Sequence, residues 1–145
     1  PFGPTANIKL TYKFSVKTSP TDPLLLAVEQ PERWTIKLNG KMIPSAMTTG
    51  WWVDPAIKTL PVDPTLLVRG RNTLTFEGQF DRLADLEIVY LLGRFGVENK
   101  GTEGALVKTP AKLTLGRWDT QGLPFYSANV IYRTTIDFQV QPEHR

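Results

Sequence analysis

The residues of this chain that could do chemistry are few in kind, since it has no Cys and a single His, His144. Without a thiol, the chain can form no disulfide, no thiolate nucleophile and no Cys-ligated zinc site. One His next to the last residue also excludes a Ser-His-Asp triad, a Cys-His pair and a multi-His metal site. Catalysis by this chain would therefore have to use carboxylates.

The carboxylates are numerous but do not form a recognisable pair. The chain has 14 Asp and Glu residues, so acids at the spacing of about 5 to 10 Å that glycoside hydrolysis needs are expected by chance. Asp22, Asp54 and Asp63 each precede a Pro, which suits turn initiation. Glu77 and Glu87 are expected to face outward from strands. We therefore predict no catalytic residue, no metal site and no cofactor.

Aromatic residues are more informative, because the C–H faces of a sugar stack on aromatic rings while its hydroxyls bond to polar groups. Trp51 and Trp52 are adjacent, so they point in opposite directions if the chain is extended there. A second aromatic loop, residues 118–127, adds Asp and Gln as hydrogen-bonding groups. The candidate carbohydrate-binding residues are Trp51, Trp52, Asp54, Trp118, Asp119, Gln121 and Tyr126.

Two interpretations of these loops stay open. Loops at one end of a β-sandwich can converge in space, so residues 50–54 and 118–127 could form one shallow site. Alternatively, Trp118, Phe125 and Tyr126 pack a long connection onto the rest of the fold, because a connection of that length needs packing of its own.

Composition and charge restrict the partners. The net charge is +3 and the 17 basic residues are scattered, which does not predict a surface that follows a phosphate backbone. The longest apolar run, residues 24–28, is far shorter than the ~20 residues that span a bilayer. We expect neither nucleic acid nor membrane as a partner. The length of 145 residues predicts one domain, and the start at Pro1 suggests a piece of a longer protein.

The elements that would position these residues are strands, because the dominant hydrophobic period is two. Residues 8–16, 34–38, 72–80 and 130–140 alternate apolar and polar positions, residues 24–28 are continuously apolar, and residues 86–95 and 113–118 suggest further strands. Asn39-Gly40 predicts a hairpin, and Asp63-Pro64 predicts one helical turn. We predict an all-β fold, a β-sandwich or jelly roll of about eight strands with at most one helical turn. The side chains expected in its core are Ile8, Leu10, Tyr12, Phe14, Val16, Trp34, Ile36, Leu38, Leu74, Phe76, Ile136 and Phe138.

Three motifs carry a family resemblance. Residues 34–40 end in Leu-Asn-Gly, residues 50–54 read Gly-Trp-Trp-Val-Asp, and residues 67–72 read Leu-Val-Arg-Gly-Arg-Asn. Together with residues 86–95 and 118–127, they resemble the galactose-binding-like β-sandwich domains of large bacterial glycoside hydrolases, of the family 2 sugar-binding and α-L-rhamnosidase type. The resemblance spans residues 8–140. It implies a non-catalytic accessory domain, secreted or periplasmic, of an enzyme whose active site lies in another domain.

Two functions remain open under this resemblance. The domain either binds carbohydrate weakly and holds the parent enzyme near its substrate, or packs against the catalytic domain and has no ligand of its own. An exposed apolar patch on one sheet face would favour packing, whereas an open aromatic-lined groove would favour carbohydrate binding. Calcium is common in such folds, but the chain has no Asp-rich loop of the kind that binds it strongly.

Overall fold

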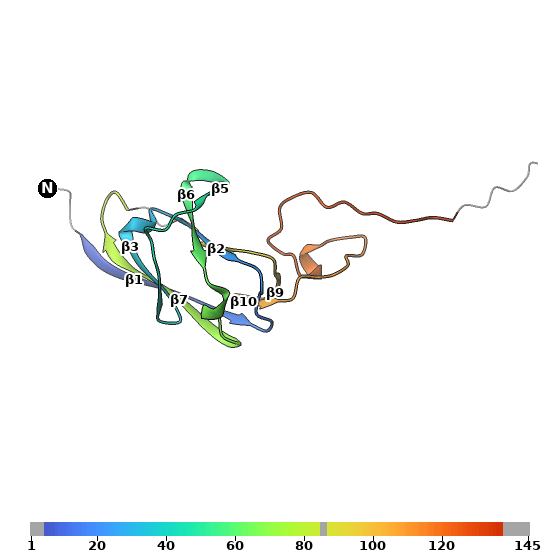
Figure 1. Cartoon of the computed structure of the whole chain (residues 1–145), viewed down its shortest axis with the longest axis horizontal. Helices are drawn as coiled ribbons and strands as arrows, with labels where there is room; N and C mark the ends of the chain where they lie inside the picture. The colour runs from blue at the N-terminus through green and yellow to red at the C-terminus, as the bar shows by residue number, and fades with distance from the viewer. Residues whose placement is uncertain (1–4, 85–86, 138–145) are drawn as a thin grey trace, which may run out of the picture.

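The computed structural model describes residues 5–84 and 87–137. These residues form ten β-strands in two sheets and three single turns of 3₁₀ helix (Figure 1). The predicted all-β sandwich is confirmed, with ten strands in place of about eight and three short turns in place of one. The elements are β1 (Ala6–Val16), β2 (Leu24–Glu29), η1 (Pro31–Arg33), β3 (Trp34–Leu38), β4 (Lys41–Ile43), β5 (Gly50–Trp52), β6 (Asp54–Val62), η2 (Pro64–Leu66), β7 (Gly70–Phe80), β8 (Tyr90–Leu92), β9 (Gly96–Lys100), β10 (Glu103–Val107) and η3 (Asp119–Gln121).

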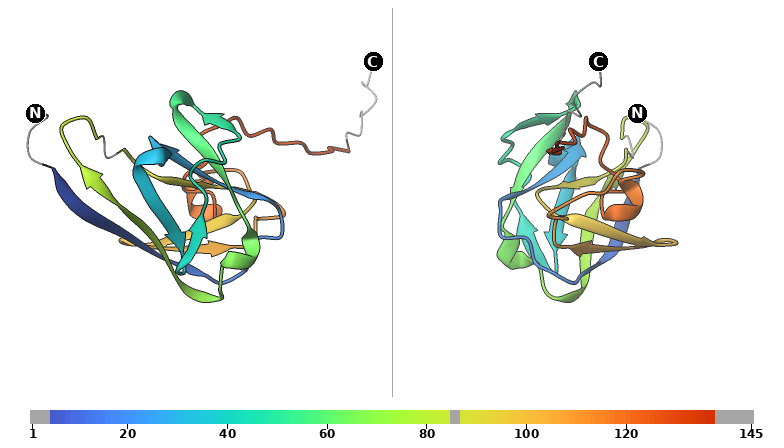
Figure 2. Two further views of the ribbon diagram at one scale, coloured as in Figure 1. Left: turned by 60° about the vertical axis from the view of Figure 1, so that its left-hand side comes forward. Right: turned by 90° about the vertical axis from the view of Figure 1, so that its right-hand side faces the viewer.

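The two sheets differ in width. The six-stranded sheet has the order β4-β3-β7-β1-β10-β9, and the four-stranded sheet has the order β5-β6-β2-β8. Strand β1 pairs antiparallel with β7 along its whole length, from Ala6 opposite Phe80 to Val16 opposite Gly70. On its other side β1 pairs with β10 in parallel, and only at Ser15 and Val16. Figure 2 shows the β1–β7 ribbon extending beyond the rest of the sandwich.

The core lies between the facing sides of these sheets, as the alternation predicts. Phe76 is its largest fully buried side chain, and the rings of Trp34 and Tyr12 meet it edge to face. Of the predicted core residues, six are buried and three are partly buried against them; these are Val16, Trp34, Ile36, Leu38, Leu74 and Phe76, then Ile8, Leu10 and Phe14.

The prediction for Tyr12 is wrong, because this side chain is 39% exposed. Tyr12 lies in the middle of β1, where the wider sheet extends past the narrower one. Across a small hollow Tyr12 faces Val89, which precedes the short strand β8. A correct alternation therefore placed Tyr12 on the inner face, but the opposite sheet is too narrow to bury it.

A side-chain hydrogen bond joins the hairpin at Asn39-Gly40 to the turn that precedes β7. Asn39 and Gly40 take positive φ values of 50° and 79°, which confirms the predicted hairpin between β3 and β4. Asp63 caps η2 by accepting a hydrogen bond from the Thr65 amide at 2.9 Å. Asn39 Nδ2 also donates to Asn72 Oδ1 at 2.7 Å, so the hairpin and the turn before β7 hold each other.

Some predicted strands are absent or displaced. Residues 113–118 and 130–137 form no strand, and Ile136 is 78% exposed, so its assignment to the core is wrong. Alternation identifies a chain that could form a strand, but a strand also needs a neighbour to pair with. Phe138 and the rest of that predicted strand lie outside the described residues. The predicted loop 99–104 is the tip of the β9–β10 hairpin. Within residues 87–95, the described part of the predicted strand 86–95, only 90–92 is a strand.

Candidate functional site

The first aromatic segment forms a hairpin at one edge of the four-stranded sheet. Strand β5 pairs with β6, and the register shifts between Trp51 and Trp52. Trp51 is 58% exposed, and Val53 at the hairpin tip is 74% exposed with a φ of 66°. The Asp54 carboxylate accepts a hydrogen bond from the Ala56 amide at 2.7 Å, which closes a local turn. The hairpin therefore presents apolar groups to solvent at its tip.

Trp52 belongs to a different surface, the outer face of the four-stranded sheet. Its ring lies 4.5 Å from that of Tyr90, centroid to centroid, with the planes tilted by 59°. The two residues come from β5 and β8, at opposite edges of this sheet, so their side chains meet across β6 and β2. Ala27 and Thr59 on those central strands are only 0% and 4% exposed although they point away from the core. The two rings therefore cover the centre of this outer face.

This outer face is apolar. Leu24, Leu26 and Val28 point into the core, so the alternate residues of β2, and their partners on β6 and β8, point outward. Glu29 is the single charged residue among them. The residues of the outer face are Leu25, Ala27, Glu29, Trp52, Ile57, Thr59, Pro61, Tyr90 and Leu92.

The outer face of the six-stranded sheet has the opposite character. Its residues on β1, β3 and β7 are polar or charged, and Glu77 at the centre bridges Lys9 and Lys37 with N–O distances of 2.8 and 3.7 Å. These residues are Lys9, Thr11, Lys13, Thr35, Lys37, Arg71, Thr73, Thr75, Glu77 and Gln79. One sheet is thus built to face water, and the other is not.

The second predicted loop uses its polar groups internally. Trp118 Nε1 donates to the Tyr126 carbonyl at 3.1 Å. Gln121 Oε1 accepts from the Thr114 amide at 2.8 Å, and its Nε2 donates to the Thr114 carbonyl at 3.1 Å. These bonds close the loop on itself and occupy its polar groups. Phe125 and Tyr126 are 72% and 43% exposed, however, so these two rings do not pack the connection onto the sandwich.

Asp119 is likewise engaged within the loop. Its carboxylate accepts hydrogen bonds from the Arg117 guanidinium, one of them at 3.1 Å from Nε. This hydrogen bond, with the positive charge of Arg117, holds the pKa of Asp119 below its ordinary value and raises the pKa of Arg117. The pair lies at the surface and orders the turn that contains η3.

The two aromatic loops do not come together. The Val97 amide on β9 donates to the Gly122 carbonyl at 2.8 Å, which ties the second loop to the far edge of the six-stranded sheet. Strand β5 is an edge of the other sheet, and Figures 1 and 2 show η3 well separated from it. The hairpin that carries Trp51, Trp52 and Asp54 therefore lies apart from the loop that carries Trp118, Asp119, Gln121 and Tyr126.

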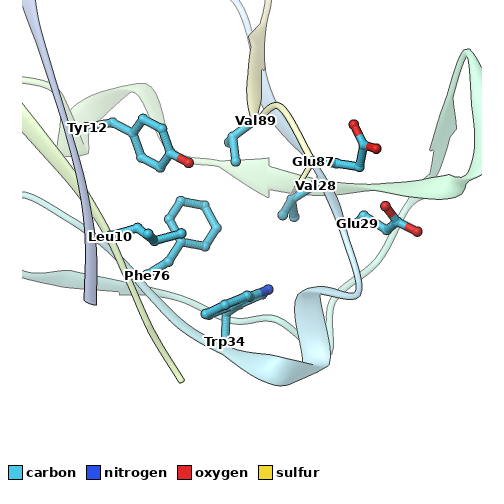
Figure 3. Close-up of a pocket in the computed structure, with 8 residues that line it drawn as sticks. All are labelled: Leu10, Tyr12, Val28, Glu29, Trp34, Phe76, Glu87 and Val89. Carbon is cyan, nitrogen blue, oxygen red and sulfur yellow. The ribbon is translucent and has the colours of Figure 1, made fainter. Parts of the chain in front are cut away.

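Two hollows in the surface are lined by none of these seven residues. The hollow in Figure 3 lies at the open side of the sandwich, and its volume of about 10 Å³ holds at most one water molecule. A larger, shallow groove lies between β4 and β6, with Met42, Met47, Pro44 and Pro61 in its wall. An aromatic-lined sugar groove is not among them.

Across residues 5–84 and 87–137, no three His, Cys, Asp or Glu side chains gather closely enough to hold a metal ion. No helix in that part of the chain is long and apolar enough to cross a membrane. Compared with known protein families, curated proteins and solved structures, the chain matches none of them.

Of the residues of this outer face, sequence reasoning singled out only Trp52 as a site residue. The signal for Leu25 was present, because residues 24–28 lack the polar positions of a strand that faces water on one side. The ring of Tyr90 could not be placed over β2 from the sequence, since that contact joins residues far apart in the chain.

Proposed function

We propose that this chain is a non-catalytic accessory module that docks through the outer face of its four-stranded sheet onto another protein domain. The observation that carries the proposal is the contrast between the two outer faces, one charged and one apolar. The centre of the apolar face is buried, but around it Leu25, Ile57 and Leu92 are half-buried and Pro61 is exposed. Apolar groups left at a surface in this way can mark an interaction site. The resemblance to galactose-binding-like domains suggests the partner, the catalytic domain of a glycoside hydrolase.

The proposal is tested first by the complete open reading frame, in which a catalytic domain is expected beside this module. In the protein that it encodes, Leu25→Lys with Leu92→Lys should lower the thermal stability of the catalytic domain, because a desolvated charge in an apolar interface is costly. Thr75→Lys, on the outer face of the other sheet, is the matched control and should change nothing. Equal effects of the two variants, or no effect of either, would refute docking through this face.

Weak carbohydrate binding is the second candidate, and the exposed ring of Trp51 is the observation that favours it. The site then centres on Trp51, because Trp52 lies on the outer sheet face against Tyr90 and the groups of the second loop are engaged within that loop. One stacked sugar should bind at about millimolar affinity, near −4 kcal/mol.

Titration with galactose, rhamnose and plant oligosaccharides, followed by tryptophan fluorescence, tests this second candidate. A saturable change that Trp51→Ala abolishes and Trp118→Ala preserves would support it. An unchanged signal at concentrations well above millimolar would leave docking as the function. In either case the purified chain should not hydrolyse aryl glycosides, since it offers no activated nucleophile.

A further inference from the structure

Strand β1 has an open edge. From Ala6 to Phe14 the backbone of β1 pairs with β7 on one side only, and within residues 5–84 and 87–137 the sole strand on its other side is β10, at Ser15 and Val16. We call this side of β1, from Ala6 to Phe14, the open edge. Unpaired backbone groups along an extended strand are a template for another strand.

The side chains along the open edge are also incompletely covered. Ile8 and Leu10 are only partly buried, and Tyr12 is exposed, because β8 is short and leaves this side of the sandwich open. The rings of Tyr12 and Phe76 and the side chain of Leu10 line the hollow of Figure 3 at this point. An added strand would satisfy the backbone of β1, and its apolar side chains would cover this gap.

The same chain carries an extended segment that lacks a strand partner. Residues 130–137, which we call the tail, have apolar Val130, Tyr132 and Ile136 at alternate positions but belong to neither sheet. The tail is close in length to the open edge, contains no Pro, and is rich in β-branched residues, as edge-pairing strands are.

The tail does not point toward the open edge of its own chain. It leaves the molecule at the end opposite the free part of β1, as Figures 1 and 2 show. The residues just before the tail are held there, since the Tyr126 hydroxyl donates to the Asn129 carbonyl at 3.2 Å and the preceding loop is hydrogen-bonded to β9. A tail directed outward is placed to reach a second molecule.

We infer that two copies of this chain exchange tails, each tail pairing as a β-strand with the open edge of the other copy. The exchange is reciprocal, so one twofold axis satisfies both edges and closes the assembly as a dimer. Alternation directs Tyr132 and Ile136 toward the uncovered side chains of β1, and Arg133 and Thr135 toward solvent. This interface is the part of β1 that β10 leaves unpaired, and it is independent of the proposed docking face.

The oligomeric state of the purified chain tests the inference. Sedimentation equilibrium over about two orders of magnitude in concentration should show a reversible monomer–dimer equilibrium. Thr134→Pro should weaken dimerisation about tenfold or more, because Pro removes a ladder hydrogen bond. Thr134→Val, which keeps the β-branched shape and the backbone amide, is the matched control and should dimerise as the wild-type chain does.

Cross-linking identifies the paired edge, since the chain has no Cys of its own. In the variant with Thr11→Cys and Thr135→Cys, a short bismaleimide should link two chains into a dimer. Lys41→Cys with Thr135→Cys, which places the thiol on β4 at the other end of the same sheet, should link far less.

Four outcomes would overturn the inference. They are a monomer at every concentration, a dimer that Thr134→Pro leaves intact, equal linking at Lys41 and Thr11, and a link within one chain. The last would mean that the tail closes its own edge.

Discussion

Asn72, near the start of β7, shows why a polar side chain can be fully buried. Its Oδ1 accepts from Asn39 Nδ2 at 2.7 Å and from the Val68 amide at 2.9 Å. Its Nδ2 donates to the carbonyls of Val68 at 2.7 Å and Gly70 at 3.0 Å. The side chain thus completes the backbone of the turn that precedes β7. The two motifs that suggested a family, the Asn-Gly hairpin and the turn ending in Asn72, are therefore one hydrogen-bonded unit with a structural role.

Replacing Asn72 should be among the most destabilising polar changes in the chain. Asn72→Ala removes the side-chain partners of the Val68 amide and of the Val68 and Gly70 carbonyls in part-buried hydrogen bonds, at a total cost of about 2 to 4 kcal/mol. Urea unfolding followed by tryptophan fluorescence measures this loss. Asn99→Ala, on exposed strand β9, is the control and should cost less than about 0.5 kcal/mol. Similar values for the two variants would contradict the role assigned to Asn72.

Val53 holds a backbone conformation that suits it poorly. Its φ of 66° is rare for a β-branched residue, and its exposed side chain has little packing to lose. Val53→Asn should therefore stabilise the chain by about 0.5 to 1 kcal/mol, since Asn tolerates left-handed backbone. Calorimetry should show a higher melting temperature. Val68→Asn, at an exposed Val without positive φ, should show no such gain. A lower melting temperature for Val53→Asn would mean that Val53 is not strained.

At the scale of elements, charge pairs tie together the three central strands of the wider sheet. Glu77 on β7 lies between Lys9 on β1 and Lys37 on β3. The hydrogen bond from Lys9, followed by the charges of Lys37 and Lys9, lowers the pKa of Glu77 from its ordinary value of 4.5. A carboxylate with a lowered pKa stabilises the folded chain above its unfolded pKa, and this stabilisation is lost as the pH falls through the folded pKa.

Removing Lys9 should therefore change how the free energy of unfolding depends on pH at acid pH. Lys9→Met is expected to raise the pKa of Glu77 toward 4.5 and to make stability depend less on pH below that value. An NMR titration of the Glu77 carboxyl measures the first effect, and urea unfolding at several pH values measures the second. Lys13→Met, on the same face of β1, is the control. An unchanged Glu77 pKa in Lys9→Met would show that the pair does not persist in solution.

An element that depends on neighbouring residues can be predicted from the sequence, whereas a strand that depends on pairing with a distant segment cannot. The hairpin at Asn39-Gly40 and the capped turn at Asp63 depend on neighbouring residues, and both were predicted. The β9–β10 hairpin was missed because residues 96–107 are polar and rich in Gly, and they become strands only by pairing with β1 and with each other. Residues 130–137 are the opposite case, since their strong alternation was mistaken for a strand of this sandwich.

At the scale of the whole molecule, the candidate site depends on which surfaces the sheets leave exposed. Residue type was enough to single out Trp51 and Trp52 from the sequence. It did not predict that Trp52 would cover Ala27 and Thr59 while Trp51 stayed in solvent. It also grouped the second loop with the first, although η3 lies at another edge. Residue type was informative about what could bind, whereas the two sheet orders decide which side chains share a face.

The final prediction concerns the tail and the unequal environments of two Ile residues. Ile36 is fully buried between the sheets, whereas Ile136 in the tail is exposed. Ile36→Ala should cost about 2 to 5 kcal/mol, because it leaves a cavity, and Ile136→Ala should cost less than about 0.5 kcal/mol. A chain ending at Val130 should match the full chain in unfolding free energy, measured at concentrations low enough to keep both monomeric. A loss of several kcal/mol on truncation would mean that residues 131–145 form part of their own sandwich, and the tail exchange inferred above would then fail as well.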